Sequence, residues 1–419
     1  MKIAVLTLGC KVNKYEGDAL IFKLRELGYD ATDKLEKADA YIINTCAVTN
    51  EAERKSRQMM ERCRKFNENA KIYVLGCASQ NRPVQFEGRN VTYIQGVANK
   101  MEIINHLNQQ GEKIYDLPSK YEDDLYSAQT LTRAFIKIQD GCNNFCTYCI
   151  IPYLRGRSRS RSMASVISEA QKLPAEVKEI VLVGIDVSSY EQNGKKALID
   201  LLEALDGLNK RLRLSSMEDN LVTEDFVERL SKLKNFCPHF HLSLQSGCDE
   251  VLKKMNRKYT TAEFYNTVTL IRKYFKNAGI TTDVIVGFPT ETESNFAETV
   301  EFIKKVQFAD LHIFPYSKRD GTVAAKIYKD LPKEVKMKRV AVLEKVKKEL
   351  KEQFINENSV LKVLIEEEKD GYFQGYSENY IKCYLQGNFK VGDIVTCEIK
   401  KPFKDGTLVK EIEKNAWQK

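Results

Sequence analysis

The sequence predicts an α/β protein made of three consecutive parts, and three observations support this fold class. Over roughly the first hundred of its 419 residues, short apolar runs alternate with helical patterns. The alternation continues through roughly the next two hundred residues, and the chain then changes to short strand patterns separated by turn residues. A hydrophobic fraction of 43% and a charged fraction of 30% are typical of folded, soluble domains. No run approaches the ~18 apolar residues of a membrane span.

The N-terminal part has a β-α-β-α-β pattern. Its expected strands are Lys2–Thr7, Ala40–Ile43 and Ile72–Leu75, and its expected helices are Tyr15–Leu27, which Gly28 would end, and Asn50–Lys65. This order predicts a parallel sheet with helices on its faces, of the flavodoxin-like or Rossmann-like kind. The polar segment Gly111–Thr132 that follows is expected to be a linker.

The central part repeats the βα pattern six times. The expected strands are Ala134–Ile138, Ile180–Val183, Arg213–Ser216, His239–Leu244, Asp283–Gly287 and Leu311–Phe314. The helical patterns include Ala164–Lys172, Leu198–Leu205, Thr223–Leu233, Thr261–Phe275 and Glu293–Lys305. Six βα units predict a partial (β/α)6 barrel with its site at the carboxyl ends of the strands. A doubly wound sheet would give the same order of elements.

The C-terminal part begins with a long basic helix pattern at Lys333–Gln353. The strand patterns after it are Val360–Ile365, Tyr372–Tyr376, Tyr380–Tyr384, Asp393–Ile399 and Leu408–Ile412. Five short strands with turn residues between them predict a small all-β barrel, similar to an OB-type module.

Eleven cysteines are an excess for a chain of this length. The apolar run near Met1–Cys10 is shorter than the roughly 7–15 residues of a secretory core, so we expect a buried first strand and a cytoplasmic protein. Cytosolic thiols stay reduced, which favours metal ligation or redox chemistry over disulfides. The four histidines are too scattered in sequence to predict a metal site: His106, His239, His241 and His312.

The most informative motif is the C-x3-C-x2-C triplet formed by Cys142, Cys146 and Cys149, just after the first strand of the expected barrel. Three thiolates on one loop can hold three irons of a [4Fe–4S] cluster and leave the fourth iron open for a chelating cosubstrate. A structural zinc site would need a fourth Cys or His nearby, and none follows. A zinc knuckle is the less favoured alternative.

A second, dispersed group consists of Cys10, Cys46 and Cys77, each just past one of the three N-terminal strands. Open α/β sheets place ligands at the carboxyl ends of their strands. Any one of these residues would pass for a buried core thiol. Three of them at equivalent positions predict a second ligand site.

The triplet at the head of six βα units resembles the radical S-adenosylmethionine (SAM) superfamily. That resemblance implies that the open iron binds the amino and carboxylate groups of SAM. Electron transfer would then cleave SAM to a 5′-deoxyadenosyl radical, which abstracts hydrogen from unreactive C–H bonds. It also places Tyr148, between the last two cysteines, near the adenine.

With both cysteine groups and a small C-terminal barrel, the whole chain resembles the methylthiotransferase family of radical SAM enzymes. The resemblance implies three domains: residues 1–115 with an auxiliary [4Fe–4S] cluster on Cys10, Cys46 and Cys77; residues 128–355, the radical SAM domain, with a cluster on Cys142, Cys146 and Cys149; and residues 357–417, an RNA-binding TRAM domain. Two SAM molecules are implied, one as methyl donor and one as radical source.

Four motifs resemble the branch that adds a methylthio group to C2 of N6-threonylcarbamoyladenosine next to the anticodon of tRNA. They are Gly9–Asn13, Asn44–Asn50, Arg54–Gln58 and Ile151–Arg161. The branches acting on isopentenyladenosine in tRNA and on a ribosomal-protein aspartate share the six cysteines and stay open as alternatives. A noncatalytic iron–sulfur or zinc RNA-binding protein is the alternative from another class.

The ends of the expected barrel strands supply candidates for holding SAM. Besides Tyr148, these are Asp186, Glu218, Gln245, Arg257 and Gly287. Glu218 and Gln245 are the preferred contacts for the ribose or amino-acid part of SAM, and Arg257 for its carboxylate. Each is also compatible with ordinary loop or helix-end structure.

A basic loop follows the cysteine triplet. In it Arg155, Arg157, Arg159 and Arg161 are expected to contact the tRNA backbone. The C-terminal part is near neutral, so RNA binding there rests on the TRAM resemblance and on aromatic side chains that could stack on bases. The implied partners are the tRNA anticodon stem-loop and an electron donor such as flavodoxin or ferredoxin. We expect a monomer with no membrane contact.

Overall fold

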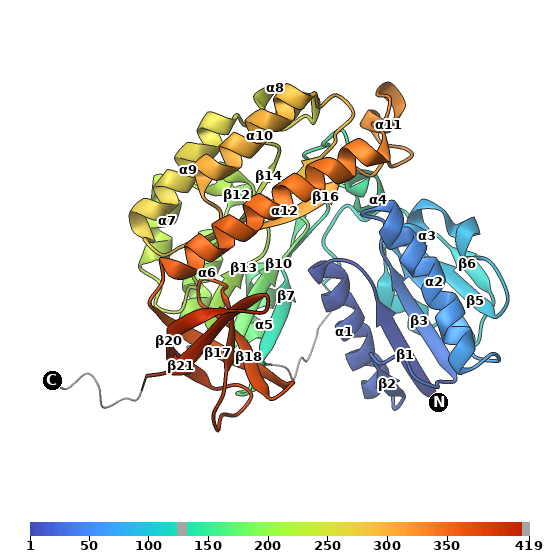
Figure 1. The fold of residues 1–419 in the computed structure, drawn as a ribbon. Helices are drawn as coiled ribbons and strands as arrows, with labels where there is room; N and C mark the ends of the chain where they lie inside the picture. Colours follow the sequence, from blue (N-terminus) through green and yellow to red (C-terminus); the bar gives the residue numbers. More distant parts are fainter. Residues whose placement is uncertain (124–131, 413–419) are drawn as a thin grey trace.

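The structure is a computed structural model that describes residues 1–123 and 132–412. The N-terminal sheet lies beside a central barrel-like unit, and a small β-barrel lies against the lower end of that unit in the view of Figure 1. The expected domain start at residue 128 and the expected domain end at residue 417 lie outside the described residues. No helix in the described part of the chain has the length and apolarity needed to cross a membrane.

The N-terminal unit is a six-stranded sheet of order β2-β1-β3-β4-β5-β6, in which every neighbouring pair is parallel. Its elements are β1 (Lys2–Thr7), α1 (Lys11–Glu26), β2 (Asp30–Thr32), β3 (Ala40–Thr45), α2 (Asn50–Phe66), β4 (Lys71–Gly76), α3 (Cys77–Asn81), η1 (Pro83–Phe86), β5 (Val91–Gln95), η2 (Lys100–Ile104) and β6 (Gly111–Lys113). Along β1, Ile3 and Val5 belong to one core cluster and Ala4 and Leu6 to another, because alternate side chains of a strand face opposite layers.

This order confirms the predicted flavodoxin-like sheet. Consecutive crossovers lead to opposite sides of β1, so the sheet has its switch point between β1 and β3, where a crevice forms at the carboxyl ends of the strands. The prediction of a linker over Gly111–Thr132 is wrong at its start, since β6 pairs with β5 as an edge strand. Residues 124–131 of that segment lie outside the described residues.

The central unit contains two three-stranded parallel sheets, β13-β10-β7 and β14-β15-β16. The strands are β7 (Arg133–Lys137), β10 (Glu179–Val183), β13 (Arg211–Leu214), β14 (His239–Gln245), β15 (Gly279–Val286) and β16 (Asp310–Pro315). Two isolated parallel bridges, Leu212 to Phe236 and Met217 to Leu242, join the half-sheets. The predicted partial (β/α)6 barrel is confirmed.

Helices and short elements complete the central unit. They are β8 (Gln139–Asp140), α4 (Ile151–Arg155), β9 (Arg159–Ser160), α5 (Met163–Gln171), η3 (Val187–Ser189), β11 (Glu191–Gln192), β12 (Lys195–Lys196), α6 (Leu198–Asp206), η4 (Asp219–Leu221), α7 (Glu224–Ser231), α8 (Asp249–Lys254), α9 (Thr261–Tyr274), α10 (Glu293–Val306), α11 (Val323–Ile327) and α12 (Lys333–Asn356). A capping box of Thr260 and Glu263 fixes the start of α9. The long helix α12 packs against β16 and α10 and runs toward the small barrel (Figure 1).

The C-terminal unit is a closed five-stranded barrel of order β17-β18-β19-β21-β20. Its strands are β17 (Val360–Lys369), β18 (Tyr372–Ser377), β19 (Lys382–Leu385), β20 (Ile394–Phe403) and β21 (Gly406–Glu411). The small all-β barrel that the turn pattern predicts is therefore confirmed.

The small barrel closes the amino end of the central strands. At the start of β10, the buried Glu179 pairs with Arg133, Arg211 and Arg213, at 2.7, 3.1 and 2.8 Å. Arg213 also donates to the Glu378 carbonyl of the small barrel at 2.9 Å. The mouth at the opposite end of the strands faces the N-terminal sheet, so the site has walls from all three units.

Candidate active site

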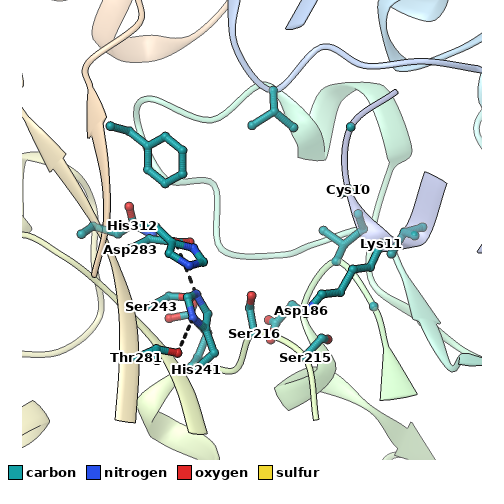
Figure 2. Close-up of a pocket in the computed structure, with 18 of the residues that line it drawn as sticks. Cys10, Lys11, Asp186, Ser215, Ser216, His241, Ser243, Thr281, Asp283 and His312 are labelled. Atoms are coloured by element: carbon teal, nitrogen blue, oxygen red, sulfur yellow. Dashed lines mark hydrogen bonds and ion pairs between the residues drawn. The ribbon is translucent and has the colours of Figure 1, made fainter. Parts of the chain in front are cut away.

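A cavity of about 910 Å³ occupies the space between the three units. Its lining includes all six cysteines of the two predicted groups: Cys10, Cys46, Cys77, Cys142, Cys146 and Cys149. It continues down the interior of the partial barrel to side chains of the small C-terminal barrel, such as Tyr380. Figure 2 shows the polar residues that several different strands direct into it.

The N-terminal cysteines lie along the crevice of the parallel sheet. Cys10 caps the start of α1, Cys46 follows β3, and Cys77 begins α3 directly after β4. Gly9, with φ +101°, brings the first loop so close that a Cβ there would lie 2.7 Å from Cys46 Cβ. The prediction that the fold gathers these three residues at one crevice agrees with this arrangement.

The other triplet lies on the loop between β8 and α4. Gly141, with φ +71°, and Phe145, with φ 48°, give the loop its turns. The Asn256 amide donates to the Phe145 carbonyl at 3.0 Å and fixes the middle of the loop. Cys142, Cys146 and Cys149 line the same cavity as the N-terminal cysteines.

All eleven cysteines are free thiols. Burial raises the pKa of Cys46, Cys142 and Cys149 to about 12 in each case, and neighbouring thiols add to the shift. Thiols with such pKa values ionise when a metal takes the place of the proton. Two sets of three soft sulfur donors fit two iron–sulfur clusters that each keep one open iron. The five remaining cysteines are buried in the core: Cys63, Cys237, Cys248, Cys383 and Cys397.

Arg257 connects the cysteine loop with the barrel strands. Its guanidinium donates to Cys146 Sγ at 3.3 Å, to the Ser243 carbonyl at 2.9 Å and to the Tyr259 hydroxyl at 3.0 Å, and it pairs with Glu218. Burial raises the pKa of Glu218 to about 7, although Arg257 opposes the shift. Glu218 and Arg257 both line the cavity, and their expected contacts with SAM stay predictions.

The other predicted SAM contacts divide into two groups. Tyr148, Asp186 and Gln245 line the cavity. Gly287 is absent from that lining: it is buried, and a Cβ there would lie 2.5 Å from the side chain of Lys336 on α12. The expected contact of Gly287 with SAM stays a prediction that the cavity lining does not support.

Three of the four arginines expected to contact tRNA are buried. Arg155 has 1% of its surface exposed, Arg159 9% and Arg161 3%. Arg161 pairs with Glu169 and with Asp123, and Arg159 donates to the backbone carbonyls of Arg155 and Arg157. Side chains committed in this way cannot neutralise phosphates, so the prediction is wrong for these three.

Arg157 is the exception. It is exposed and lies over the ring of Phe145 in the cysteine loop, 4.4 Å from the ring centroid. It is the member of the predicted set that remains available to a phosphate backbone.

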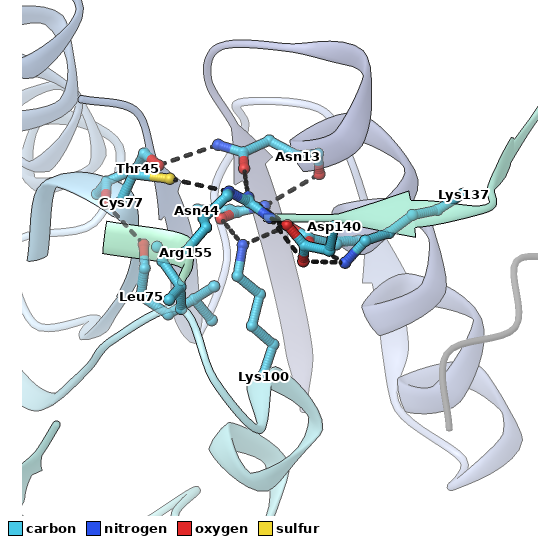
Figure 3. Close-up of polar contacts among 12 residues, drawn as sticks. Asn13, Asn44, Thr45, Leu75, Cys77, Lys100, Lys137, Asp140 and Arg155 are labelled. Atoms are coloured by element: carbon cyan, nitrogen blue, oxygen red, sulfur yellow. Dashed lines mark hydrogen bonds and ion pairs between the residues drawn. The ribbon is translucent and has the colours of Figure 1, made fainter. Parts of the chain in front are cut away.

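Arg155 instead belongs to a buried charge network between the N-terminal sheet and the barrel (Figure 3). It pairs with Glu16 on α1 and with Asp140 on β8, each at 3.0 Å. Lys100, Lys137 and Arg159 complete the network. Its four cations outnumber its two carboxylates.

The surplus charge of this network reaches the sulfur site. Arg155 Nε lies 3.3 Å from Cys77 Sγ. At that distance the guanidinium can donate a charge-assisted hydrogen bond to a sulfur that ligates a metal.

Sequence reasoning missed a polar cluster inside the barrel. Asp283 Oδ1 lies 3.3 Å from both His241 Nε2 and His312 Nδ1. His241 also shares a hydrogen bond with Thr281 at 2.9 Å. One donor atom from each of the two histidines and the aspartate lies within 4.8 Å of the others, a donor set that could hold a divalent metal ion.

Two of the four histidines that are scattered in the sequence are thus brought together by the fold. β14 and β16 flank β15, and Asp283 and His312 are register partners on neighbouring strands. The alternation of inward residues along the predicted strands was the available signal.

Comparisons with known proteins agree with this arrangement. The Radical SAM superfamily matches residues 136–303, and the Uncharacterized protein family UPF0004 matches residues 2–96. The Threonylcarbamoyladenosine tRNA methylthiotransferase MtaB of Bacillus subtilis is 39% identical, covering 98% of this chain and 97% of its own. The chain belongs to the radical SAM methylthiotransferase family. Its members use two [4Fe–4S] clusters and SAM, which the two cysteine sets fit.

Other members of the methylthiotransferase family are also similar. The MtaB protein of Thermotoga maritima is 35% identical, over 97% of this chain and 96% of its own. A tRNA-2-methylthio-N(6)-dimethylallyladenosine synthase of Clostridium botulinum is 37% identical, over 86% and 85%. Among solved structures, a radical SAM methyltransferase of Kitasatospora setae, TsrM, shares the fold with a TM-score of 0.56 at 13% identity, over 77% of each chain.

Proposed function

We propose that this protein adds a methylthio group to C2 of N6-threonylcarbamoyladenosine next to the anticodon of tRNA. The observation that carries the proposal is the single cavity lined by two cysteine triplets from separate units. Radical formation and sulfur delivery must act on one carbon atom, so both sites have to face it. Full-length relatives named for threonylcarbamoyladenosine support this nucleoside as the substrate.

In this proposal, each triplet holds one [4Fe–4S] cluster: Cys142, Cys146 and Cys149 the SAM-binding cluster, and Cys10, Cys46 and Cys77 the auxiliary cluster. When bound, the clusters and SAM supply the radical, the sulfur and the methyl group.

The chain's own residues orient and protect these groups. Arg257 and Arg155 each donate a hydrogen bond toward a ligand sulfur, which orients that cysteine. With the substrate in the cavity, the walls would limit the contact of a reactive intermediate with bulk water.

The substrate has to leave the anticodon loop and enter the cavity. Proteins that modify a base commonly extrude it from its stack into a pocket. The exposed Arg157, beside the cysteine loop, is suited to the backbone of that loop. We assign the small C-terminal barrel to the TRAM type and expect it to bind the stem, with an external flavodoxin or ferredoxin as electron donor.

The test is anaerobic reconstitution followed by reaction with anticodon stem-loop RNAs that carry either threonylcarbamoyladenosine or dimethylallyladenosine. We expect about eight irons per chain, reductive cleavage of SAM, and methylthiolation of the threonylcarbamoyl RNA. Cys146→Ala should abolish SAM cleavage, whereas Cys46→Ala should retain some cleavage but form no methylthio product. Methylthiolation by either variant would refute the assigned roles. Modification of the dimethylallyl RNA alone would refute the substrate.

A further inference from the structure

Lys11 is a cation inside the cavity that the roles described above do not use. It is the first residue of α1 and directly follows Cys10. Its side chain extends into the cavity (Figure 2). Within residues 1–123 and 132–412, it has no hydrogen-bond or ion-pair partner. By contrast Lys14, one turn along the same helix, pairs with Asp18 at 2.7 Å and is not part of the lining.

The carboxylates whose charge reaches Lys11 are already engaged. Glu179 is shared among three arginines, and Asp283 is shared between His241 and His312.

Lys11 is an exposed residue whose ammonium is open to the cavity. Because the described part of the chain gives it no partner, an anionic group that enters the cavity can pair with it through a charge-assisted hydrogen bond. This part of the cavity can therefore bind an anion.

The proposed substrate supplies such an anion. The amino-acid arm on N6 of threonylcarbamoyladenosine ends in a carboxylate and carries a hydroxyl, whereas a dimethylallyl arm is apolar. Hydrogen bonds between charged partners are among the stronger protein contacts. A site with an unpaired ammonium favours a carboxylate over an apolar arm, because only the carboxylate pairs with the charge.

We propose that Lys11 forms a carboxylate-binding subsite that receives the amino-acid arm of the modified adenosine and selects it over an apolar arm. The inference rests on the proposed function for the identity of the substrate. It places the selecting residue next to the auxiliary cysteine site, so the nucleoside is oriented from the N-terminal wall of the cavity. His312, whose side chain is 55% exposed, faces the same space from the barrel wall.

The experiment measures the anaerobic binding of the cluster-loaded full chain to three stem-loop RNAs. They carry threonylcarbamoyladenosine, its methyl ester or dimethylallyladenosine at the same position. The wild type should bind the free acid about 10- to 100-fold more tightly than the ester, the range expected for one charged hydrogen-bonded contact. Lys11→Met should reduce that ratio to about 1, and Lys11→Arg should restore part of it. Lys14→Met is the matched control and should keep the full ratio.

The proposal is overturned if the wild type binds acid and ester equally, or if Lys11→Met keeps the wild-type ratio. The wild-type comparison decides the matter even if a variant folds poorly. Product analysis runs on the same samples. A preference for the free acid without methylthio product would support the subsite and refute the proposed function. Methylthio product formed without that preference would support the proposed function and refute the subsite.

Discussion

Glu16 lies where three buried cations from two units converge, so Glu16→Gln is a direct test of how the site is held together. Its carboxylate, with a side chain 2% exposed, pairs with Lys137 at 2.8 Å, with Arg155 at 3.0 Å and with Lys100. Burial alone would raise the pKa of Glu16, but these three cations hold it well below its ordinary value. The carboxylate is therefore ionised at neutral pH, so it interacts with the three cations as a full negative charge.

The substitution leaves Arg155 and Lys137 with Asp140 as their remaining carboxylate, and it takes from Lys100 the carboxylate with which it pairs. Removing one partner from a buried ion pair costs about 3–5 kcal/mol, because the other charges stay desolvated. For a unit of this size, that loss corresponds to a decrease of roughly 6–20 °C in the unfolding midpoint. The Arg155 contact with Cys77 depends on the same network, so iron retention should fall as well.

The matched control is Glu26→Gln on the same helix. Glu26 pairs with Lys23 at 3.1 Å, but both side chains are about half exposed, at 47% and 50%. Such a surface pair contributes at most about 1 kcal/mol. The assay is anaerobic calorimetry at pH 7 on both variants, with iron content measured alongside. Equal midpoints for the two variants would refute the reasoning that the network holds the interface.

Three further results are expected. Burial would raise the pKa of Glu179, but Arg213 and Arg133 lower it to about 2. The stabilisation that Glu179 contributes is therefore complete above pH 4.5 and is lost as the pH falls toward 2. Glu179→Gln should flatten the acid unfolding curve over that window, and an unchanged curve would contradict the pairing. The exposed Arg157 should contribute to RNA binding, so Arg157→Ser should weaken binding and reduce its salt dependence by about one ion. The buried Arg161 should contribute to stability, so Arg161→Ser should lower the thermal unfolding midpoint. The reverse pattern would contradict the exposure of Arg157 and the burial of Arg161. A Cβ at Gly141 would lie 2.0 Å from the Arg157 carbonyl, so Gly141→Ala should leave about four of eight irons, and full iron loading would count against this strain.

Much of the fold was predictable because its strands are short, apolar and regularly spaced. The run Lys2–Thr7 is the same in prediction and structure. The strand predicted at Arg213–Ser216 instead spans Arg211–Leu214, because Arg211 and Arg213 are buried by pairing with Glu179. Hydrophobic pattern alone assigns such arginines to the surface.

The same limit explains the errors at the site. The alternation of arginine and serine after the cysteine triplet gives no sign that Arg155 meets Glu16, 139 residues earlier in the chain. Nor does the spacing of His241, Asp283 and His312 show that neighbouring strands bring them together. The cysteine positions were more informative, because parallel topology alone brings the strand ends to one edge.

The wall of the central barrel is a continuous ladder within each half-sheet, but between β13 and β14 it is fastened only at the bridges near Leu212 and Met217. Side chains from both half-sheets pack into one apolar core, so this seam is held mainly by packing and not by a ladder of backbone hydrogen bonds. Amide exchange along that seam should be faster than within either half-sheet.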